Sequence, residues 1–243
     1  MIPRFHFPSP LAPGAQVELP DAAAHHAVKV LRMKSGDALV LFDGGGGEWL
    51  ATLKVGAGRT AQATLGEFLD RDCESPLAVT LVQALPSGDK MDWVVEKCVE
   101  LGVSAIQPVM SKRSVVRLSA ERMARRVAHW NAIASAACEQ CGRNRVPVVA
   151  PVLDLPQYLA ASKVQNSQRF LLAPTGGASL RACATPTEPV HILIGPEGGW
   201  EEGEVLAAQA AGCRPLSLGG RVLRTETAGM TALAAMQARW GDF

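Results

Sequence analysis

The feature that most constrains this fold is an apolar run ending in a glycine-rich turn at residues 191–200, with the sequence His-Ile-Leu-Ile-Gly-Pro-Glu-Gly-Gly-Trp. The run predicts a buried strand, and the glycines and proline predict a rigid turn before a helix. Parallel α/β proteins bind their ligands at such strand ends. A second stretch, at residues 218–228, repeats this plan, so we expect two loops at neighbouring strand ends to form one pocket.

Strands and helices alternate from residue 77 onward, which predicts an α/β fold with a parallel sheet covered by helices. The apolar runs predict strands at residues 77–85, 105–110, 169–173, 190–194 and 214–218. The helical patterns predict helices at residues 89–101, 119–140, 201–211 and 227–240.

The first part of the chain predicts a small β domain. Residues 38–42 and 48–53 flank a polyglycine turn and indicate a hairpin. A helix is expected from Asp21 to Leu31, with Asp21 as its N-cap and Ala24, Val28 and Leu31 on one face. The segment 70–76 is charged and ends in proline, which predicts a domain boundary there. The two expected domains are residues 1–72 and 73–243.

Composition excludes several classes of protein. With 243 residues, 48% of them hydrophobic, the chain can bury a large core. No apolar run approaches the roughly 20 residues that span a bilayer, and the first residues lack a secretion signal, so we expect a cytoplasmic protein. The formal net charge of +1 excludes a globally basic protein, so nucleic-acid binding would need local patches. The six scattered cysteines are typical of reduced thiols.

The first loop, residues 195–199, is built for close approach of a ligand to the backbone. It lacks the Lys-Ser/Thr of a phosphate-binding loop, and Glu197 would repel phosphate. An adenosyl group joined to a cationic sulfonium and an amino acid fits better, since it needs backbone hydrogen bonds and apolar walls. The alternative is a tight turn whose glycines serve geometry alone.

The second loop combines helix-start residues with two arginines. Thr225 or Thr227 can cap the final helix, and Glu226 suits its positive end. Helix capping does not explain Arg221 and Arg224, because the helix dipole disfavours cations there. Arginine at this position suits a phosphate or an anionic base.

Basic residues also cluster in three other places. They lie at Lys112, Arg113, Arg117, Arg122, Arg125 and Arg126; at Arg143 and Arg145; and at Arg4, Lys29, Arg32 and Lys34. Each cluster alone is typical of a solvated surface. Three clusters on two domains favour an RNA phosphate backbone held between them.

No metal site is expected. Cys138 and Cys141 have the spacing of a zinc pair, but no second pair of ligands follows. The histidines His25, His26, His129 and His191 have no partner at ligand or nucleophile spacing, so we assign them to packing or surface.

The motifs, taken in order, resemble the bacterial ribosomal small-subunit RNA methyltransferase E family of the SPOUT superfamily. The matching segments are Pro-Arg at 3–4, Val-Leu-Arg-Met at 30–33, Gly-Asp-Lys-Met at 88–91, Glu-Lys-Cys-Val-Glu-Leu-Gly-Val at 96–103, residues 137–145, residues 194–199 and residues 221–227. They cover nearly the whole chain.

The resemblance implies a PUA-like β-barrel domain followed by a SPOUT methyltransferase domain with a C-terminal trefoil knot. It also implies S-adenosylmethionine as cofactor and a homodimer, for which Leu233, Met236 and Trp240 of the last helix offer an apolar surface. Gly220 stands where other members often carry proline, which loosens the loop.

The implied reaction is methylation of N3 of a specific uridine in 16S rRNA, on the assembled small subunit. Arg224 is the candidate to stabilise the uridine anion, and Glu197 or Glu226 the candidate to accept its proton or orient the arginine. The expected cofactor contacts are Leu193, Ile194, Gly195, Pro196, Glu197, Gly198, Gly199, Leu218, Gly219, Leu223, Thr225, Thr227 and Ala228. The expected RNA contacts are Arg4, Arg32, Lys34, Lys90, Arg113, Arg117, Arg143, Arg145 and Arg221.

Two alternatives stay open at this point. The chain could be a SPOUT-type methyltransferase acting on transfer RNA or on another ring atom. It could also be a non-catalytic RNA-binding protein, which would not need to bind S-adenosylmethionine.

Overall fold

The computed structural model describes residues 2–57, 60–114, 119–162 and 167–243. The chain divides into two compact units. The first comprises Met1–Glu74 and Ser135–Val146, and the second comprises Ser75–Ala134 and Pro147–Phe243. Residues 135–146 therefore belong with the N-terminal part of the chain, which no sequence pattern indicated.

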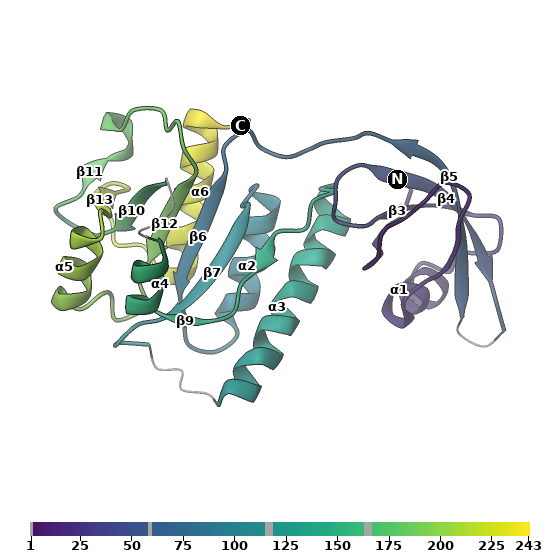
Figure 1. The fold of residues 1–243 in the computed structure, drawn as a ribbon, viewed down its shortest axis with the longest axis horizontal. Helices are drawn as coiled ribbons and strands as arrows, with labels where there is room; N and C mark the ends of the chain where they lie inside the picture. Colours follow the sequence, from purple (N-terminus) through teal and green to yellow (C-terminus); the bar gives the residue numbers. More distant parts are fainter. Residues whose placement is uncertain (1, 58–59, 115–118, 163–166) are drawn as a thin grey trace. The chain divides into compact units, whose positions relative to one another are not determined.

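The first unit is built on a five-stranded sheet in the order β1-β3-β4-β5-β2. Figure 1 labels its strands β3, β4 and β5. Its strands are β1 (Arg4–His6), β2 (Gln16–Glu18), β3 (Ala38–Phe42), β4 (Glu48–Val55) and β5 (Ala61–Leu69). The predicted hairpin is confirmed as the antiparallel pair β3 and β4. β1 pairs with β3 in parallel, and the remaining pairs are antiparallel.

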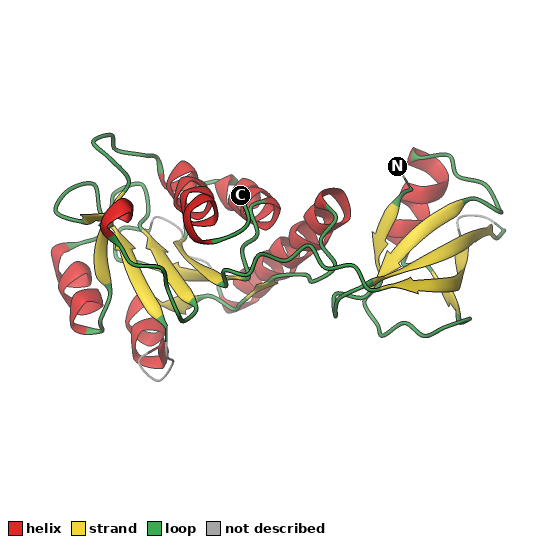
Figure 2. Ribbon diagram, turned by 90° about the horizontal axis from the view of Figure 1, so that it is seen from above, coloured by secondary structure: helices red, strands yellow, loops and turns green. Residues whose placement is uncertain are grey.

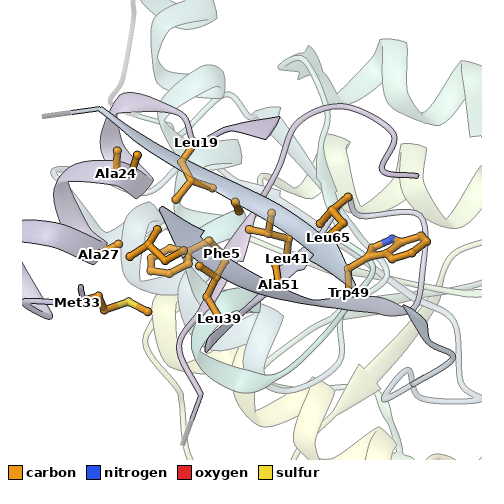
Figure 3. Close-up of a cluster of buried hydrophobic side chains, with 13 residues drawn as sticks. Phe5, Leu19, Ala24, Ala27, Met33, Leu39, Leu41, Trp49, Ala51 and Leu65 are labelled. Carbon is orange, nitrogen blue, oxygen red and sulfur yellow. The ribbon is translucent and has the colours of Figure 1, made fainter. Parts of the chain in front are cut away.

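Alternate residues of these strands form the core of the first unit (Figure 3). Phe5, Leu39, Leu41 and Ala51 point to the same buried side, as the two-residue period of a strand requires. The adjoining helix contributes Ala24 and Ala27.

That helix differs from the prediction. It runs as α1 (Asp21–His25) and continues as a π-helical segment, η1 (His26–Val30). Pro20 is the N-cap, so the prediction for Asp21 was wrong by one residue. A π-helical turn is wider than an α-helical one, which shifts the buried face: Ala24 is buried, but Leu31 is 43% exposed.

The second unit contains an eight-stranded sheet in the order β11-β13-β10-β12-β6-β7-β8, with β9 pairing with β7. All of its strand pairs are parallel. The predicted strands are confirmed as β6 (Val79–Ala84), β7 (Ala105–Met110), β10 (Gln168–Leu172), β12 (Val190–Ile194) and β13 (Arg214–Ser217). The short strands β8 (Val148–Val149), β9 (Leu153–Asp154) and β11 (Ala178–Ser179) were not predicted.

Helices cover both faces of this sheet (Figure 2). The predicted helices are confirmed as α2 (Lys90–Glu100), α3 (Ala120–Cys141), α5 (Glu202–Ala210) and α6 (Thr225–Trp240), while α4 (Leu155–Ser162) and the 3-10 turn η2 (Leu180–Ala182) were not predicted. α4 and α5 share a buried apolar cluster with one face of the strands. On the other face, α6 packs against α2, β6 and β12.

The last helix uses its apolar side chains within its own unit. Leu233 and Met236 are 1% and 0% exposed, so they are not available to a second copy. The predicted dimer surface is therefore wrong at these two residues, because both side chains are buried within the fold.

Within the described residues, no helix is both long and apolar enough to span a membrane. None of the six cysteines, which all lie in the described part of the chain, forms a disulfide, and Cys98, Cys138 and Cys213 are buried.

Candidate functional site

A cavity of about 600 Å³ lies where β10 and β12 end and in the loops that follow β12 and β13. This volume suits a small organic ligand. Its lining consists of Leu171, Leu172, Ala173, Pro174, Ile194, Gly195, Pro196, Glu197, Gly199, Trp200, Val205, Leu218, Gly219, Arg221, Val222, Leu223, Arg224, Thr225, Glu226 and Ala228. The two loops singled out in the sequence thus line one cavity.

The strands that carry these loops are not neighbours, which corrects the sequence-based expectation. β10 lies between β12 and β13 in the sheet. The end of β10 and the residues after it, Leu171 to Pro174, therefore line the cavity as well. The sequence predicted this strand but not its place in the sheet, so these residues were missed.

Three residues expected at the pocket lie outside its lining. Leu193 is fully buried on the face covered by α4 and α5, because alternate residues of β12 point to opposite sides. The carbonyl of Gly198 accepts a hydrogen bond from Arg113 Nη1 at 2.7 Å. Thr227 lies in the first turn of α6, where its carbonyl accepts a bond from Thr231 Oγ1.

The start of α6 also differs from the prediction. Arg224 is the N-cap, and neither Thr225 nor Thr227 caps the helix with its side chain. The Thr225 hydroxyl instead donates to the carbonyl oxygen of Gly195, at 2.5 Å. This bond joins Gly195, the first residue of the first loop, to the start of α6, which follows the second loop.

Glu197 is held by the segment between β6 and α2. Its Oε1 accepts hydrogen bonds from the Ser87 amide at 3.0 Å, the Ser87 hydroxyl at 2.6 Å and Lys90 Nζ at 2.7 Å. Partial burial raises the pKa of this carboxyl, but the bonds from Lys90 and Ser87 together outweigh it and lower the pKa to about 2. Glu197 is therefore ionised at neutral pH and is a weak base.

Lys90 also lies near the second carboxylate of the cavity. Its Nζ is 3.9 Å from Glu226 Oε2, which is too far for a hydrogen bond. That oxygen is buried and has no hydrogen-bond partner among the described residues. Glu226 lines the cavity in the first turn of α6, so this oxygen is a buried acceptor next to the ligand space.

Trp200 provides a second unpartnered group at the cavity. Its indole Nε1 is a buried donor with no partner among the described residues. The ring lies against Gly195, where an added Cβ would come within 3.2 Å of Nε1. Glycine at position 195 therefore suits this close packing. The sequence analysis placed Trp200 at the end of the first stretch but did not include it among the expected cofactor contacts.

Comparison with known proteins identifies the family. Residues 73–237 match the RNA methyltransferase domain family, and residues 19–65 match the RNA methyltransferase PUA domain family. The ribosomal RNA small subunit methyltransferase E of a Synechocystis strain is 38% identical over 231 residues, covering 92% of this chain and 73% of that protein. This chain belongs to the small-subunit rRNA methyltransferase E family.

Solved structures agree with this assignment. A small-subunit rRNA methyltransferase E from Neisseria gonorrhoeae, bound to S-adenosylmethionine, is 41% identical, with a TM-score of 0.92 over 100% of both chains. A methyltransferase from Legionella pneumophila, also with S-adenosylmethionine, is 36% identical, with a TM-score of 0.94 over 100% of both chains. The predicted resemblance and the parallel α/β fold are confirmed.

Two arginines that were expected to contact RNA, Arg4 and Arg143, are instead buried in the first unit. Arg4 pairs with Glu48, and the two side chains are 7% and 5% exposed. Arg143 pairs with Glu74, its Nε lying 3.0 Å from Oε1, and its side chain is 6% exposed. Both RNA predictions are wrong, because these guanidinium groups are enclosed by protein carboxylates.

The remaining basic residues that were expected to contact RNA fall into three groups. Lys90 and Arg113 bind Glu197 and the Gly198 carbonyl, so their polar groups hold the first loop. Arg117 lies outside the described residues. The exposed residues that stay candidates for RNA are Arg32, Lys34, Arg145 and Arg221.

Proposed function

We propose that this chain transfers a methyl group from S-adenosylmethionine to N3 of a uridine in 16S rRNA, on the assembled small subunit. The observation that carries the proposal is the cavity at the strand ends, which is lined by the cation Arg224 and by Glu226, whose buried Oε2 has no hydrogen-bond partner among the described residues. Membership of the small-subunit rRNA methyltransferase E family supports the substrate class.

The lining residues fit S-adenosylmethionine. Leu172, Ile194, Leu218 and Leu223 offer apolar walls for an adenine ring, and Trp200, whose buried indole N–H has no partner among the described residues, lines the same cavity. The carboxylates of Glu197 and Glu226 suit a cationic sulfonium. The cavity volume of about 600 Å³ accommodates a molecule of this size.

The cofactor supplies a methyl group bonded to a cationic sulfur, which makes the carbon electrophilic. The protein must then generate a nucleophilic uracil nitrogen and hold it in line with that carbon. We assign Glu226 as the acceptor of the N3 proton, because none of the described residues donates a hydrogen bond to its Oε2. Arg224, which is exposed at the N-cap of α6, stabilises the uracil anion.

Glu197 has a different role in this proposal. Three hydrogen bonds occupy its Oε1, and its pKa of about 2 makes proton transfer to it unfavourable. We assign it to positioning: it fixes the first loop to the segment that carries Ser87 and Lys90.

We further propose that residues 1–72 act as a PUA-like RNA-binding domain, that residues 73–243 form a SPOUT domain with a trefoil knot, and that the enzyme acts as a homodimer. The exposed basic residues Arg32, Lys34, Arg145 and Arg221 are proposed to contact phosphate groups. Replacing Arg221 by Gln should weaken RNA binding and reduce its logarithmic salt slope by about 1.

The test is methyl transfer from labelled S-adenosylmethionine to purified small subunits lacking uridine-N3 methylation, with naked 16S rRNA and bulk transfer RNA assayed in parallel. Mass-spectrometric mapping identifies the methylated atom. We expect N3-methyluridine on the subunits alone. Label on transfer RNA or at another ring atom would refute the substrate assignment, and no label on any RNA would refute the reaction.

A further inference from the structure

A buried chain of hydrogen bonds joins three elements beneath the cavity. Thr225 Oγ1, at the start of α6, donates to the Gly195 carbonyl after β12, at 2.5 Å. The same oxygen accepts a bond from Gln83 Nε2 of β6, at 2.9 Å. Gln83 is 0% exposed and Thr225 is 5% exposed. Figure 1 shows α6 running beside β6 and β12.

An amide and a hydroxyl are costly groups to bury in an apolar core. Gln83 lies between Val82 and Ala84, which are both fully buried. Apolar side chains at Gln83 and Thr225 would satisfy packing without this cost. The burial of Gln83 and Thr225 therefore indicates a role for their hydrogen bond beyond core packing.

The backbone of α6 is adapted to the same contact. Gly229 lies where the helix crosses β6, and an added Cβ there would come within 3.2 Å of Leu81 Cδ1 and 3.5 Å of Gln83 Oε1. Glycine inside a helix costs about 1 kcal/mol relative to alanine. This glycine permits the close approach that brings Gln83 within hydrogen-bond distance of Thr225.

The bonded residues belong to both walls of the cavity. Gly195 begins the first loop, and Thr225 lies between Arg224 and Glu226, which also line the cavity. Gln83 is not part of the lining, so it would act only through Thr225. We propose that Gln83 and Thr225 are positioning residues that fix the separation of the two walls for the cofactor. This inference rests on the proposed function, since it takes S-adenosylmethionine as the ligand.

The first experiment measures the affinity of S-adenosylmethionine by isothermal titration calorimetry. Thr225→Val keeps the shape of the side chain but removes the hydroxyl, and we expect affinity to fall about tenfold, which is about 1.4 kcal/mol. Thr225→Ser keeps the hydroxyl, and its affinity for S-adenosylmethionine should stay within about twofold of that of the wild type. Gln83→Leu should bind S-adenosylmethionine several-fold more weakly than the wild type. The double variant Gln83→Leu/Thr225→Val should lose less affinity than the product of the two single losses.

Thr231→Val is the matched control, because it removes a hydroxyl of the same helix that bonds to a helix carbonyl and does not line the cavity. We expect it to lower the melting temperature with no change in cofactor affinity. The inference is overturned if Thr225→Val binds as tightly as the wild type, or if affinity tracks melting temperature across all variants.

Different results would refute the proposed reaction and this inference. A wild-type protein that binds S-adenosylmethionine but methylates no RNA refutes the reaction, while the binding series still decides the role of Gln83 and Thr225. A wild type that does not bind S-adenosylmethionine refutes both. In active protein, Thr225→Val should raise the KM for S-adenosylmethionine and leave the KM for RNA unchanged.

Discussion

Lys90 Nζ lies 2.7 Å from Glu197 Oε1 and 3.9 Å from Glu226 Oε2, so one ammonium group lies within 4 Å of both carboxylates of the cavity. Two negative groups facing one ligand space repel each other unless a cation lies between them. The environments of the two carboxylates differ, since Glu197 Oε1 accepts three hydrogen bonds and Glu226 Oε2 has no partner among the described residues.

Replacing Lys90 by Met should raise the pKa of Glu197 from about 2 toward its ordinary value of 4.5. Because the native pKa is depressed, this interaction contributes stability above pH 4.5 and loses it as pH falls toward 2. The difference in unfolding free energy between the wild type and Lys90→Met should therefore shrink between pH 4.5 and pH 2. Carbon NMR of the Glu197 carboxyl and urea unfolding at several pH values measure both effects.

Lys97→Met is the matched control, since Lys97 lies on the same helix and pairs with Glu96 and Glu100 instead. It should leave the titration of Glu197 unchanged. A Glu197 that titrates at the same pH in Lys90→Met as in the wild type would show that Lys90 does not set its pKa.

Replacing Glu226 by Gln should lower kcat about 100-fold, because the amide cannot accept the N3 proton. Cofactor affinity should change less than about threefold. Glu197→Gln should have the smaller effect on kcat, since Glu197 is assigned to positioning. Single-turnover assays with separate binding measurements distinguish the two, and a larger loss of kcat in Glu197→Gln would reverse the assignment.

Replacing Arg143 by Met should destabilise the first unit by about 3 kcal/mol, because Glu74 would keep a largely buried charge without its partner. Urea unfolding measures this loss. Arg145→Met, on a side chain that is 56% exposed, should change stability by less than about 1 kcal/mol. The double variant Glu74→Gln/Arg143→Met should recover part of the loss, and equal effects of the two single variants would contradict the buried ion pair.

Replacing Gly195 by Ala should weaken cofactor binding, because the new Cβ would lie 3.2 Å from the Trp200 indole and displace it. The matched control is Gly203→Ala, within α5, where an added Cβ meets nothing within 4 Å. That change should raise stability by about 0.5 kcal/mol and leave binding intact. Wild-type affinity in Gly195→Ala would show that the indole is not part of the binding surface.

The strands and helices of the second unit were predictable because buried parallel strands read as apolar runs between helical patterns. Residues 105–110 and 190–194 match β7 and β12 at both ends. The loops after β12 and β13 were identified from glycine, proline and charged residues alone. Local chemistry was sufficient for these features.

Features that depend on contacts between distant segments were not predictable. The order of strands places β10 between β12 and β13, and nothing in residues 168–172 encodes that neighbour. In the sequence, Arg4 and Arg143 look like the exposed arginines of a basic surface patch. Only the folded chain brings Glu48 to Arg4 and Glu74 to Arg143. The bond between Gln83 and Thr225 likewise joins residues that are 142 positions apart.

The most direct test of the central claim is nucleoside mass spectrometry of 16S rRNA from cells that lack this protein. The account predicts that N3-methyluridine is absent, that the wild-type chain restores it, and that the Glu226→Gln variant, expressed at the same level, does not. N3-methyluridine that persists at the wild-type level in the deletion strain would contradict it.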